Sequence, residues 1–173
     1  MYHQFEIPTL EEGFDFVSWA YMTKPNCIVV DLDGTLCDVS RRRQYVATKP
    51  RNWNAWNAGI INDRPILQVL EVLNALKDRF PIFFVSGRSD DYRDVTLKWF
   101  EKYGIMEHDY NGLLMRKYED HRDDAIVKGE LADQIEKDYN IFAVFDDRQR
   151  VIKNTWISRG VFVFDVSQGK GNF

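Results

Sequence analysis

The chain has 173 residues, which is enough for one domain with a sizeable hydrophobic core. Hydrophobic residues make up 45% of it and the formal net charge is −4, which excludes a generally basic nucleic-acid-binding coat but allows a local basic patch. The two cysteines, Cys27 and Cys37, have no neighbouring His or Cys cluster, so they indicate neither a disulfide framework nor a zinc site. Residues Met1–Pro8 lack the basic and apolar regions of a signal peptide, and no apolar run approaches the length of a membrane span. We therefore expect a cytoplasmic protein that does not associate with membranes.

The first element along the chain is a predicted amphipathic helix within residues 1–24. Thr9 and Glu12 have the spacing of a capping box, and apolar residues then recur at helical spacing as far as Lys24-Pro25. Three aromatic residues lie on this segment: Phe14, Phe16 and Trp19. We expect them to pack on the domain, because an amphipathic helix covers a core more often than it binds a partner.

A short apolar strand, Cys27–Val30, is followed by two acids that folding does not require. Asp31 ends the strand, Asp33 comes two residues later, and Gly34 follows. Neighbouring carboxylates repel each other and lose hydration on burial, so they are expected where a cation or a reaction makes use of them. The pattern predicts a nucleophile at Asp31 and an acid/base at Asp33, both beside a magnesium ion.

Residues 37–64 form a long connection that is rich in basic and aromatic side chains. It holds three consecutive arginines and two tryptophans: Arg41, Arg42, Arg43, Trp53 and Trp56. Connections of this length inside a compact domain are usually functional. This one is too short for a full cap domain, so we expect a flap or minimal cap. Its cations and aromatics would suit phosphates and stacked bases, although tryptophans three residues apart equally suit the core of a flap.

Amphipathic helices and buried strands alternate over the rest of the chain. The predicted order is a helix from Pro65 to about Arg79, strand Pro81–Val85, a helix that ends at Gly104, strand Leu113–Met115, a helix from about Asp124 to Tyr139, strand Ile141–Phe145, a helix containing Trp156, and strand Val161–Phe164. With the first strand, this order predicts an α/β fold: a doubly wound, mostly parallel, five-stranded Rossmann-like sheet with helices on both faces. The chain shows no domain linker or internal repeat, so residues 1–173 are expected to form a single domain.

The carboxyl edge of that sheet is expected to collect the polar residues that follow three of its strands. They are Asp31 and Asp33, Ser86 and Arg88, and Asp146 and Asp147, with Lys128 brought alongside from its helix. Four carboxylates in one cleft cannot all be ionised without cations. Oxygen ligands alone select a hard metal, so we expect Mg²⁺ as the cofactor, and Lys128, Ser86 and Arg88 would help a phosphate to approach.

These residues resemble the motifs of the haloacid dehalogenase-like phosphohydrolases. Asp31-Leu32-Asp33-Gly34-Thr35 is similar to the first motif of that family, Ser86 to the second, Lys128 to the third and Asp146-Asp147 to the fourth, in the family's order and across about residues 27–165. The resemblance implies a phospho-aspartyl enzyme. Asp31 would attack phosphorus, and Asp33 would protonate the leaving oxygen and then activate water. Asp31, the Asp33 carbonyl and Asp146 would bind Mg²⁺, with Asp147 supporting it through water.

A narrower resemblance is to the phosphatase domain of phage polynucleotide kinase/3′-phosphatase. It rests on Ser86-Gly87-Arg88, on the segment Arg122-Asp123-Asp124 that leads to Lys128, and on Asp146-Asp147-Arg148. It implies a substrate or phosphate site made by Ser86, Gly87, Arg88, Asp124 and Arg42, the arginine eleven residues past the nucleophile. The residues alone leave two of these roles open, because Arg42 would serve equally in a surface salt bridge and Asp124 would favour a helix N-terminus. The sequence departs from that family in residues 37–64, and no P-loop pattern occurs in it, so we expect no kinase activity from these 173 residues.

Three main functions remain open from the sequence, besides phosphate transfer to a second substrate, which is less favoured although mutases share these motifs. The first is a Mg²⁺-dependent phosphatase that removes the 3′-phosphate of a nucleic-acid end, which a site without a large cap would admit. The second is a mononucleotide or small-molecule phosphatase with the same mechanism. The third, from another class, is a regulatory or binding module that keeps a phospho-aspartate, as receiver domains do. Asp33 argues against the third, because it would promote hydrolysis of the intermediate.

Overall fold

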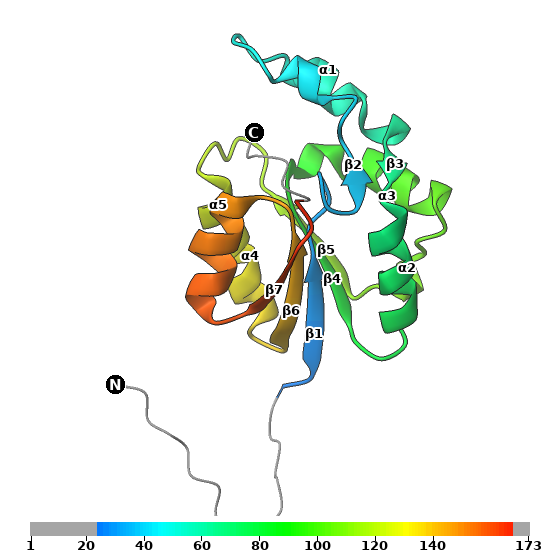
Figure 1. Ribbon diagram of the computed structural model, residues 1–173, viewed down its shortest axis with the longest axis vertical. Helices are drawn as coiled ribbons and strands as arrows, with labels where there is room; N and C mark the ends of the chain where they lie inside the picture. Colours follow the sequence, from blue (N-terminus) through cyan, green and yellow to red (C-terminus); the bar gives the residue numbers. More distant parts are fainter. Residues whose placement is uncertain (1–23, 168–173) are drawn as a thin grey trace, which may run out of the picture.

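Residues 24–167 are described by a computed structural model that is built around one five-stranded sheet (Figure 1). All of its strands are parallel, and they lie in the order β5-β4-β1-β6-β7. They are β1 (Asn26–Val30), β4 (Ile82–Ser89), β5 (Gly112–Arg116), β6 (Asn140–Asp146) and β7 (Phe162–Asp165). The predicted doubly wound α/β fold is confirmed, with a sheet that is entirely parallel.

Strand β1 lies at the centre of the sheet, and this position explains its apolar sequence. Cys27 to Val30 are at most 2% exposed, because β4 and β6 flank the strand and helices cover both faces of the sheet. In register, Val30 pairs with Phe84 of β4 and with Phe145 of β6. The polar residues that follow these three positions therefore leave the sheet at the same edge.

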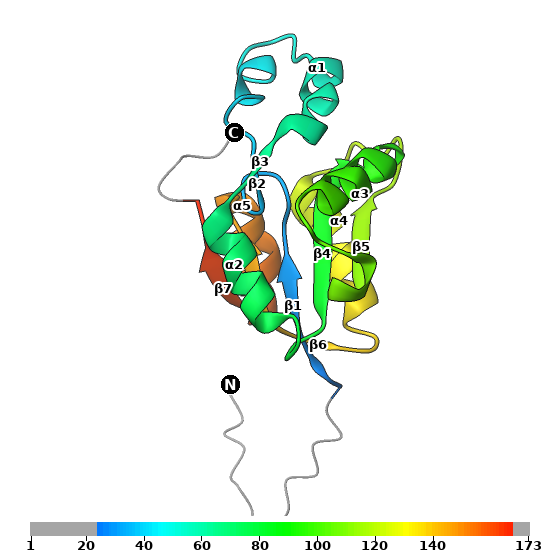
Figure 2. The same ribbon diagram turned by 90° about the vertical axis from the view of Figure 1, so that its right-hand side faces the viewer.

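Helices α2 and α3 cover one face of the sheet, and α4 and α5 cover the other (Figures 1 and 2). They are α2 (Leu67–Leu76), α3 (Arg93–Lys102), α4 (Asp124–Ile135) and α5 (Gln149–Val151), which continues as a π-helical turn (Ile152–Trp156). Each face has its own hydrophobic cluster. One includes Leu73 of α2 and Trp99 of α3, and the other includes Leu131 of α4 and Trp156 after α5. The two clusters hold the sheet rigidly from both sides.

An insert between the first strand and α2 lies beyond the carboxyl ends of the strands (Figures 1 and 2). Its base is a two-stranded antiparallel ladder of β2 (Cys37–Asp38) and β3 (Arg64–Pro65). Between them lie α1 (Trp53–Ala58) and two 3-10 turns, Arg43–Tyr45 and Ile60–Asn62. The connection predicted over residues 37–64 therefore has helical structure of its own. Its action as a flap stays a prediction.

Several predicted boundaries are wrong by a few residues. Pro65 pairs with Cys37 in the β2–β3 ladder, so α2 begins at Leu67 and ends at Leu76 instead of running from Pro65 to Arg79. Strand β4 continues past Val85 to Ser89, with an irregular register against β5. These differences arise because pairing across the sheet extends an element beyond its apolar run.

The helix predicted for residues 1–24 falls outside the described residues, except for Lys24 at its end. Helix α4 ends at Ile135, four residues before the predicted end at Tyr139, whose backbone N–H still bonds the Ile135 carbonyl. None of the helices in residues 24–167 is long and apolar enough to cross a lipid bilayer.

Candidate active site

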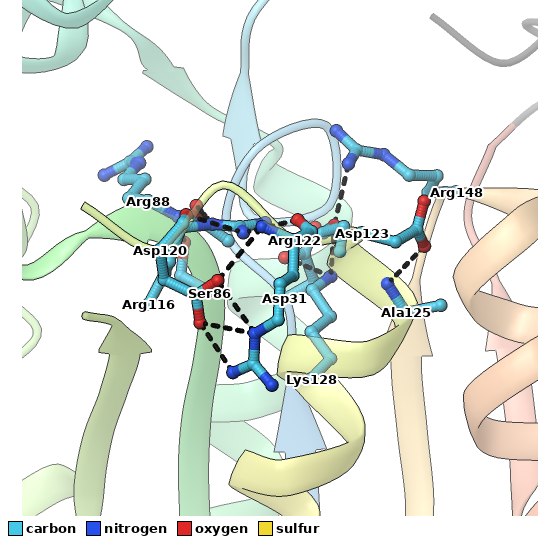
Figure 3. A network of polar contacts seen from close by, with 12 residues as sticks. Asp31, Ser86, Arg88, Arg116, Asp120, Arg122, Asp123, Ala125, Lys128 and Arg148 are labelled. Carbon is cyan, nitrogen blue, oxygen red and sulfur yellow. Dashed lines mark hydrogen bonds and ion pairs between the residues drawn. The ribbon is translucent and has the colours of Figure 1, made fainter. Parts of the chain in front are cut away.

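The Asp31 carboxylate lies just beyond β1 against the ammonium group of Lys128, which reaches it from α4 (Figure 3). Lys128 Nζ donates to Asp31 Oδ1 at 2.7 Å and to Asp146 Oδ2 at 2.9 Å. Asp146 closes β6 and also accepts a hydrogen bond from Trp156 Nε1 at 3.0 Å. All three charged groups are buried. Burial alone would lower the pKa of Lys128, but Asp146 and Asp31 raise it above its usual value, so Lys128 is a fixed cation.

Asp147 completes a cluster of three acids with Asp31 and Asp146. One carboxylate oxygen from each residue lies within 4.8 Å of the others. Burial raises the pKa of Asp31 despite Lys128, with Asp146 and Asp147 adding to the rise, and burial and Asp146 likewise raise the pKa of Asp147. Such a cluster gains stability from a divalent cation, and oxygen-only ligands suit a hard one. The residues present therefore fit a divalent metal.

The turn after β1 is shaped to receive the Asp147 carboxylate. Thr35 Oγ1 donates to Asp147 Oδ1 at 3.2 Å and lies 3.4 Å from Asp31 Oδ2. Gly34 has a φ of +96°, and a Cβ at this position would lie 2.2 Å from Asp147 Oδ2. Glycine is thus required both by the backbone conformation and by the space that the carboxylate fills.

Asp33 lies between two arginines instead of within the acid cluster. Arg88 Nη2 donates to Asp33 Oδ1 at 2.6 Å and Arg88 Nε donates to Oδ2 at 3.0 Å, while Arg42 Nη2 donates to Oδ1 at 2.6 Å. Burial works to raise the pKa of Asp33, but Arg88 and then Arg42 hold it below its usual value. Because the side chain is bonded to the arginines, a metal ligand from Asp33 would be its backbone carbonyl, as the resemblance implies.

Arg42 is only 2% exposed, which excludes the surface salt bridge that the sequence left open. It donates to Asp63 through Nε at 2.9 Å and through Nη2 at 2.5 Å while also holding Asp33. Its guanidinium carbon lies 4.3 Å from the centroid of the Trp56 ring. The Asp63 carbonyl is in turn anchored by Trp99 Nε1 at 3.0 Å. The insert is therefore connected to the second acid of the site through one buried arginine.

The end of β4 carries Ser86, Gly87 and Arg88 in an irregular turn. Ser86 Oγ accepts from the Arg88 backbone N–H at 3.2 Å. A Cβ on Gly87 would lie 2.1 Å from Asp124 Oδ1, so glycine lets the first turn of α4 approach this segment. Arg116 fixes both partners, because its Nε donates to the Gly87 carbonyl at 2.8 Å and its Nη2 to Asp124 Oδ1 at 3.0 Å.

Asp124 is surrounded by cations. Besides Arg116, Arg148 Nη1 donates to Asp124 Oδ2 at 2.7 Å, and Lys128 Nζ lies 4.0 Å from the same oxygen. Burial opposes its ionisation, but Lys128 and Arg148 lower the pKa of Asp124. The N-cap of α4 is Asp123, whose side chain accepts from the Ala125 N–H, and Asp124 lies in the first turn, where negative charge is favourable. Asp124 thus holds Arg116 and Arg148 close to Lys128 by its negative charge.

These groups surround a cleft of about 1050 Å³ at the carboxyl edge of the sheet. We call its base the floor, defined as Asp31, Asp33, Ser86, Arg88 and Lys128, all of which line the cleft; Asp33 is partly buried and the other four are buried. Gly87 and Asp124 line it too. Asp146 lies behind Lys128, and Arg42 lies behind Asp33. Except for Arg42, the residues that the sequence assigned to the site thus come from segments around the end of one parallel sheet.

Two residues that complete this arrangement, Asp63 and Arg116, were not singled out from the sequence. Trp156 was predicted only as a residue of the helix after Asp146 and Asp147, without a role at the site. Each of the three contacts a predicted site residue, namely Arg42, Asp124 or Asp146. Thr35 is different, because it stands inside the first motif and its hydroxyl was available as a signal. Partners of buried charges follow from the fold and not from local pattern.

Comparison with known proteins agrees with this geometry. Residues 25–173 match the family model for the polynucleotide kinase PNKP phosphatase domain. A protein of Autographa californica nuclear polyhedrosis virus, assigned as a bifunctional polynucleotide kinase/RNA ligase, is 31% identical over 132 residues. That alignment covers 75% of this chain but only 17% of the viral protein, so the chain corresponds to a small part of its relative.

Several solved structures have the same fold as this chain. A chain of the Pnkp1/Rnl/Hen1 complex superposes with a TM-score of 0.69 at 28% identity, covering 91% of this chain and 50% of that one. The class C acid phosphatase of Bacillus anthracis, with tungstate bound, shares the fold at 18% identity and a TM-score of 0.60, covering 78% of this chain and 55% of that one. A haloacid dehalogenase-like family hydrolase of Streptococcus pneumoniae shares it at 15% identity and a TM-score of 0.61, covering 86% and 87% of the two chains. The chain belongs to the polynucleotide kinase phosphatase-domain family, within the haloacid dehalogenase-like phosphatases.

Proposed function

We propose that the chain is a Mg²⁺-dependent phosphomonoesterase that removes 3′-phosphates from polynucleotide ends through an aspartyl-phosphate intermediate. The observation that carries this proposal is a pair of acids in contrasting surroundings on one cleft floor. Asp31 lies against Lys128 and the acid cluster, whereas Asp33 lies between Arg88 and Arg42. A nucleophile alone would only capture a phosphoryl group, and the second acid allows the group to leave again.

In the first step, a carboxylate oxygen of Asp31 attacks the phosphorus of the monoester. A bond forms between this oxygen and phosphorus while the bond from phosphorus to the sugar oxygen breaks. Asp33 gives its proton to the departing oxygen, so the product leaves as an alcohol. Arg88 and Arg42 hold the pKa of Asp33 low in the free chain. Protonation of Asp33 therefore requires the bound phosphate, because a neighbouring negative charge raises the pKa of a carboxyl group.

In the second step, Asp33 is a carboxylate and takes a proton from a water molecule. The water oxygen attacks phosphorus, the bond between Asp31 and phosphorus breaks, and inorganic phosphate leaves with Asp31 regenerated. Lys128 holds Asp31 in place through both steps by its 2.7 Å hydrogen bond. No co-reactant beyond water is needed, so atoms and charges balance.

The acids Asp31, Asp146 and Asp147 are the side chains that would hold Mg²⁺, with the Asp33 carbonyl. When bound, the ion would screen the repulsion between the Asp31 carboxylate and the phosphate. We assign Ser86, Gly87 and Lys128 to the phosphate oxygens. Arg88 lines the cleft beside Asp33 and can serve both, while Arg42 and Asp124 act through the residues that they hold.

The polynucleotide substrate is supported by family membership and by the names of the relatives. The viral relative is named for polynucleotide kinase and RNA ligase activities, and a structural relative at 28% identity belongs to a complex described as an RNA repair complex. An accessible cleft edge also suits the end of a long chain. These relatives are much longer than the chain, so their other activities and their partners are not carried over.

The test is phosphate release with Mg²⁺ from a 3′-phosphorylated oligonucleotide, a 5′-phosphorylated oligonucleotide and a panel of mononucleotides, measured in parallel with Asp31→Asn as the blank. We expect the 3′-phosphorylated oligonucleotide to be hydrolysed with the highest kcat/KM. Faster turnover of mononucleotides would contradict the substrate and leave the mechanism standing. A phosphoryl group that stays on Asp31 without release would instead favour a regulatory module.

A further inference from the structure

Within residues 24–167, two cations of the cleft differ from the others that line it in forming no ion pair with an acid. Six basic residues that line it are paired with carboxylates: Arg88, Arg116, Arg122, Lys128, Arg148 and Arg150. Within the described part of the chain, Arg51 and Lys117 line the same cleft and form no ion pair, and both are exposed. Their charge is therefore available to an anion that enters the cleft.

Each of these cations is next to an exposed aromatic side chain that also lines the cleft. Trp53 is 51% exposed and Tyr118 is 64% exposed. The Arg51 guanidinium carbon lies 5.7 Å from the centroid of the Trp53 ring, and Lys117 directly precedes Tyr118 in the chain. We call Arg51, Trp53, Lys117 and Tyr118 the rim. It repeats one pair, a cation with an aromatic ring, on two segments that are far apart in sequence.

The Trp53 ring is braced from the insert. Trp53 is the first residue of α1, and the preceding Asn52 caps the helix by accepting from the Ala55 N–H at 3.0 Å. Its ring meets the Trp56 ring edge to face, with 6.5 Å between centroids, and Trp56 is itself packed under buried Arg42. The half-exposed ring therefore stands on a supported base and loses little freedom when a ligand covers it.

Tyr118 is held in a similar way by its backbone. Its N–H donates to Asp90 Oδ1 at 2.9 Å, and Asp120 N–H closes a turn onto the Lys117 carbonyl at 3.1 Å. Glu119 has a φ of 62°, a left-handed conformation that is uncommon for a residue other than glycine. Strained turns of this kind persist where the surroundings fix them, and they concentrate at binding sites. The ring itself remains exposed to the cleft.

We propose that the rim binds an unpaired nucleic-acid 3′ end, with Trp53 and Tyr118 each stacking on a base and Arg51 and Lys117 pairing with backbone phosphates upstream. The inference rests on the proposed function, since the floor would hold the terminal phosphate of the same strand. Alternating cations and exposed aromatic rings are the arrangement by which proteins bind single strands without sequence preference. A base inside a duplex is already stacked on both faces, so the rim selects a single-stranded end.

The test compares two 3′-phosphorylated single-stranded oligonucleotides that differ only in their last two nucleotides, which carry bases in one and are abasic in the other. We expect the wild-type chain to have a kcat/KM about 5- to 150-fold higher for each base that stacks. Trp53→Ala or Tyr118→Ala should reduce this ratio toward one. Because the ratio is taken on one enzyme, a general loss of activity cancels. Phe162→Ala, an equally exposed aromatic on β7 outside the cleft, is the matched control and should leave the ratio unchanged.

Two further measurements keep the outcomes distinct. Trp53→Phe should restore most of the ratio lost in Trp53→Ala, and a 3′-phosphate in a blunt duplex should be hydrolysed with a higher KM than one on a single strand. Equal ratios in Trp53→Ala, Tyr118→Ala and Phe162→Ala, or equal KM for duplex and single strand, would overturn the inference about the rim. A wild-type chain that hydrolyses p-nitrophenyl phosphate but neither oligonucleotide would overturn the proposed substrate instead.

Discussion

The floor and the rim of the cleft are built on opposite principles. On the floor, Asp31, Asp33 and Lys128 are buried or nearly so, and each is bonded to at least one group of opposite charge. On the rim, Arg51 and Lys117 are exposed and form no ion pair within the described residues. Buried charges are costly without partners, so the floor must be satisfied before substrate arrives, whereas exposed groups can wait for a ligand.

This contrast separates two kinds of mutational effect. Removing one member of a buried ion pair typically costs about 3 to 5 kcal/mol of stability, because the other charge is left uncompensated. Replacing an exposed residue without such a contact usually changes stability by no more than about 0.5 kcal/mol. Floor variants should therefore alter chemistry and stability together, while rim variants should alter substrate binding with little change in stability.

The largest effect is expected for Asp31→Asn. The amide is nearly isosteric but cannot attack phosphorus, so phosphate release should fall by roughly 10⁴-fold or more for every substrate. Turnover is measured as released phosphate under saturating substrate, with circular dichroism to check that the chain is folded. Unchanged turnover in this variant would remove the nucleophile from the floor and with it the mechanism.

Removal of the metal should be almost as severe. Chelation by EDTA should abolish activity and lower Tm, and Mg²⁺ should restore both, because the ion binds only the folded acid cluster. The pKa values of Asp31 and Asp147 are raised by burial, so both acids hold protons to a higher pH than usual and metal binding must displace them. Apparent Mg²⁺ affinity, measured by calorimetry, should therefore fall as pH decreases. An Asp147→Asn variant with the same Mg²⁺-induced rise in Tm would speak against the cluster.

Asp33→Asn should separate the two steps of the reaction. Without a carboxylate to activate water, phosphate release should slow by about 10²- to 10⁴-fold, and phosphorylated Asp31 should accumulate with substrates whose leaving group needs no proton. Intact-protein mass spectrometry after a rapid quench measures this species. Arg88 and Arg42 also lose their shared partner, so Tm should fall. Burst kinetics identical to those of the wild type would exclude Asp33 from the second step.

The sequence predicts the floor of the cleft better than its surroundings. The floor was predictable because strand ends in a parallel sheet share one edge, and acids at such ends are unusual enough to be noticed. Asp63 was not predictable, because its importance lies in a contact with Arg42 across 21 residues of insert. Tyr118 was not predictable either, although it is exposed and not buried. A single exposed tyrosine in a charged segment shows no sequence pattern, and its role is visible only once the cleft beside it is known. The order of helices and strands was predicted correctly. Their boundaries were predicted less well, because strand pairing sets several of them.

Asp63→Asn tests the connection between insert and floor. The substitution leaves the backbone carbonyl of residue 63 in place, and this carbonyl accepts hydrogen bonds from Trp99 Nε1 and Tyr103 Oη. The local fold should therefore survive, but Arg42 loses the negative charge of its ion-pair partner. Displacement of Arg42 would misplace Asp33, and kcat should fall by up to about 10²-fold with a smaller change in KM. Asp109→Asn, which disrupts the Lys77–Asp109 ion pair away from the cleft, serves as the control. An equal kcat in the two variants would show that Arg42 is positioned without Asp63.

The smallest effect is expected at the two rim cations and concerns salt. If Arg51 and Lys117 each neutralise one backbone phosphate of a single strand, each contributes about 0.7 to the slope of log affinity against log salt concentration. Arg51→Gln and Lys117→Gln should each reduce that slope by this amount, measured by fluorescence anisotropy with a labelled 3′-phosphorylated oligonucleotide from low to moderate salt. Lys153→Gln, a cation on the helix after β6 that does not line the cleft, should leave the slope unchanged. This slope measures the number of counterions released from the oligonucleotide on binding. A wild-type slope in both rim variants would therefore show that the bound oligonucleotide does not contact Arg51 or Lys117.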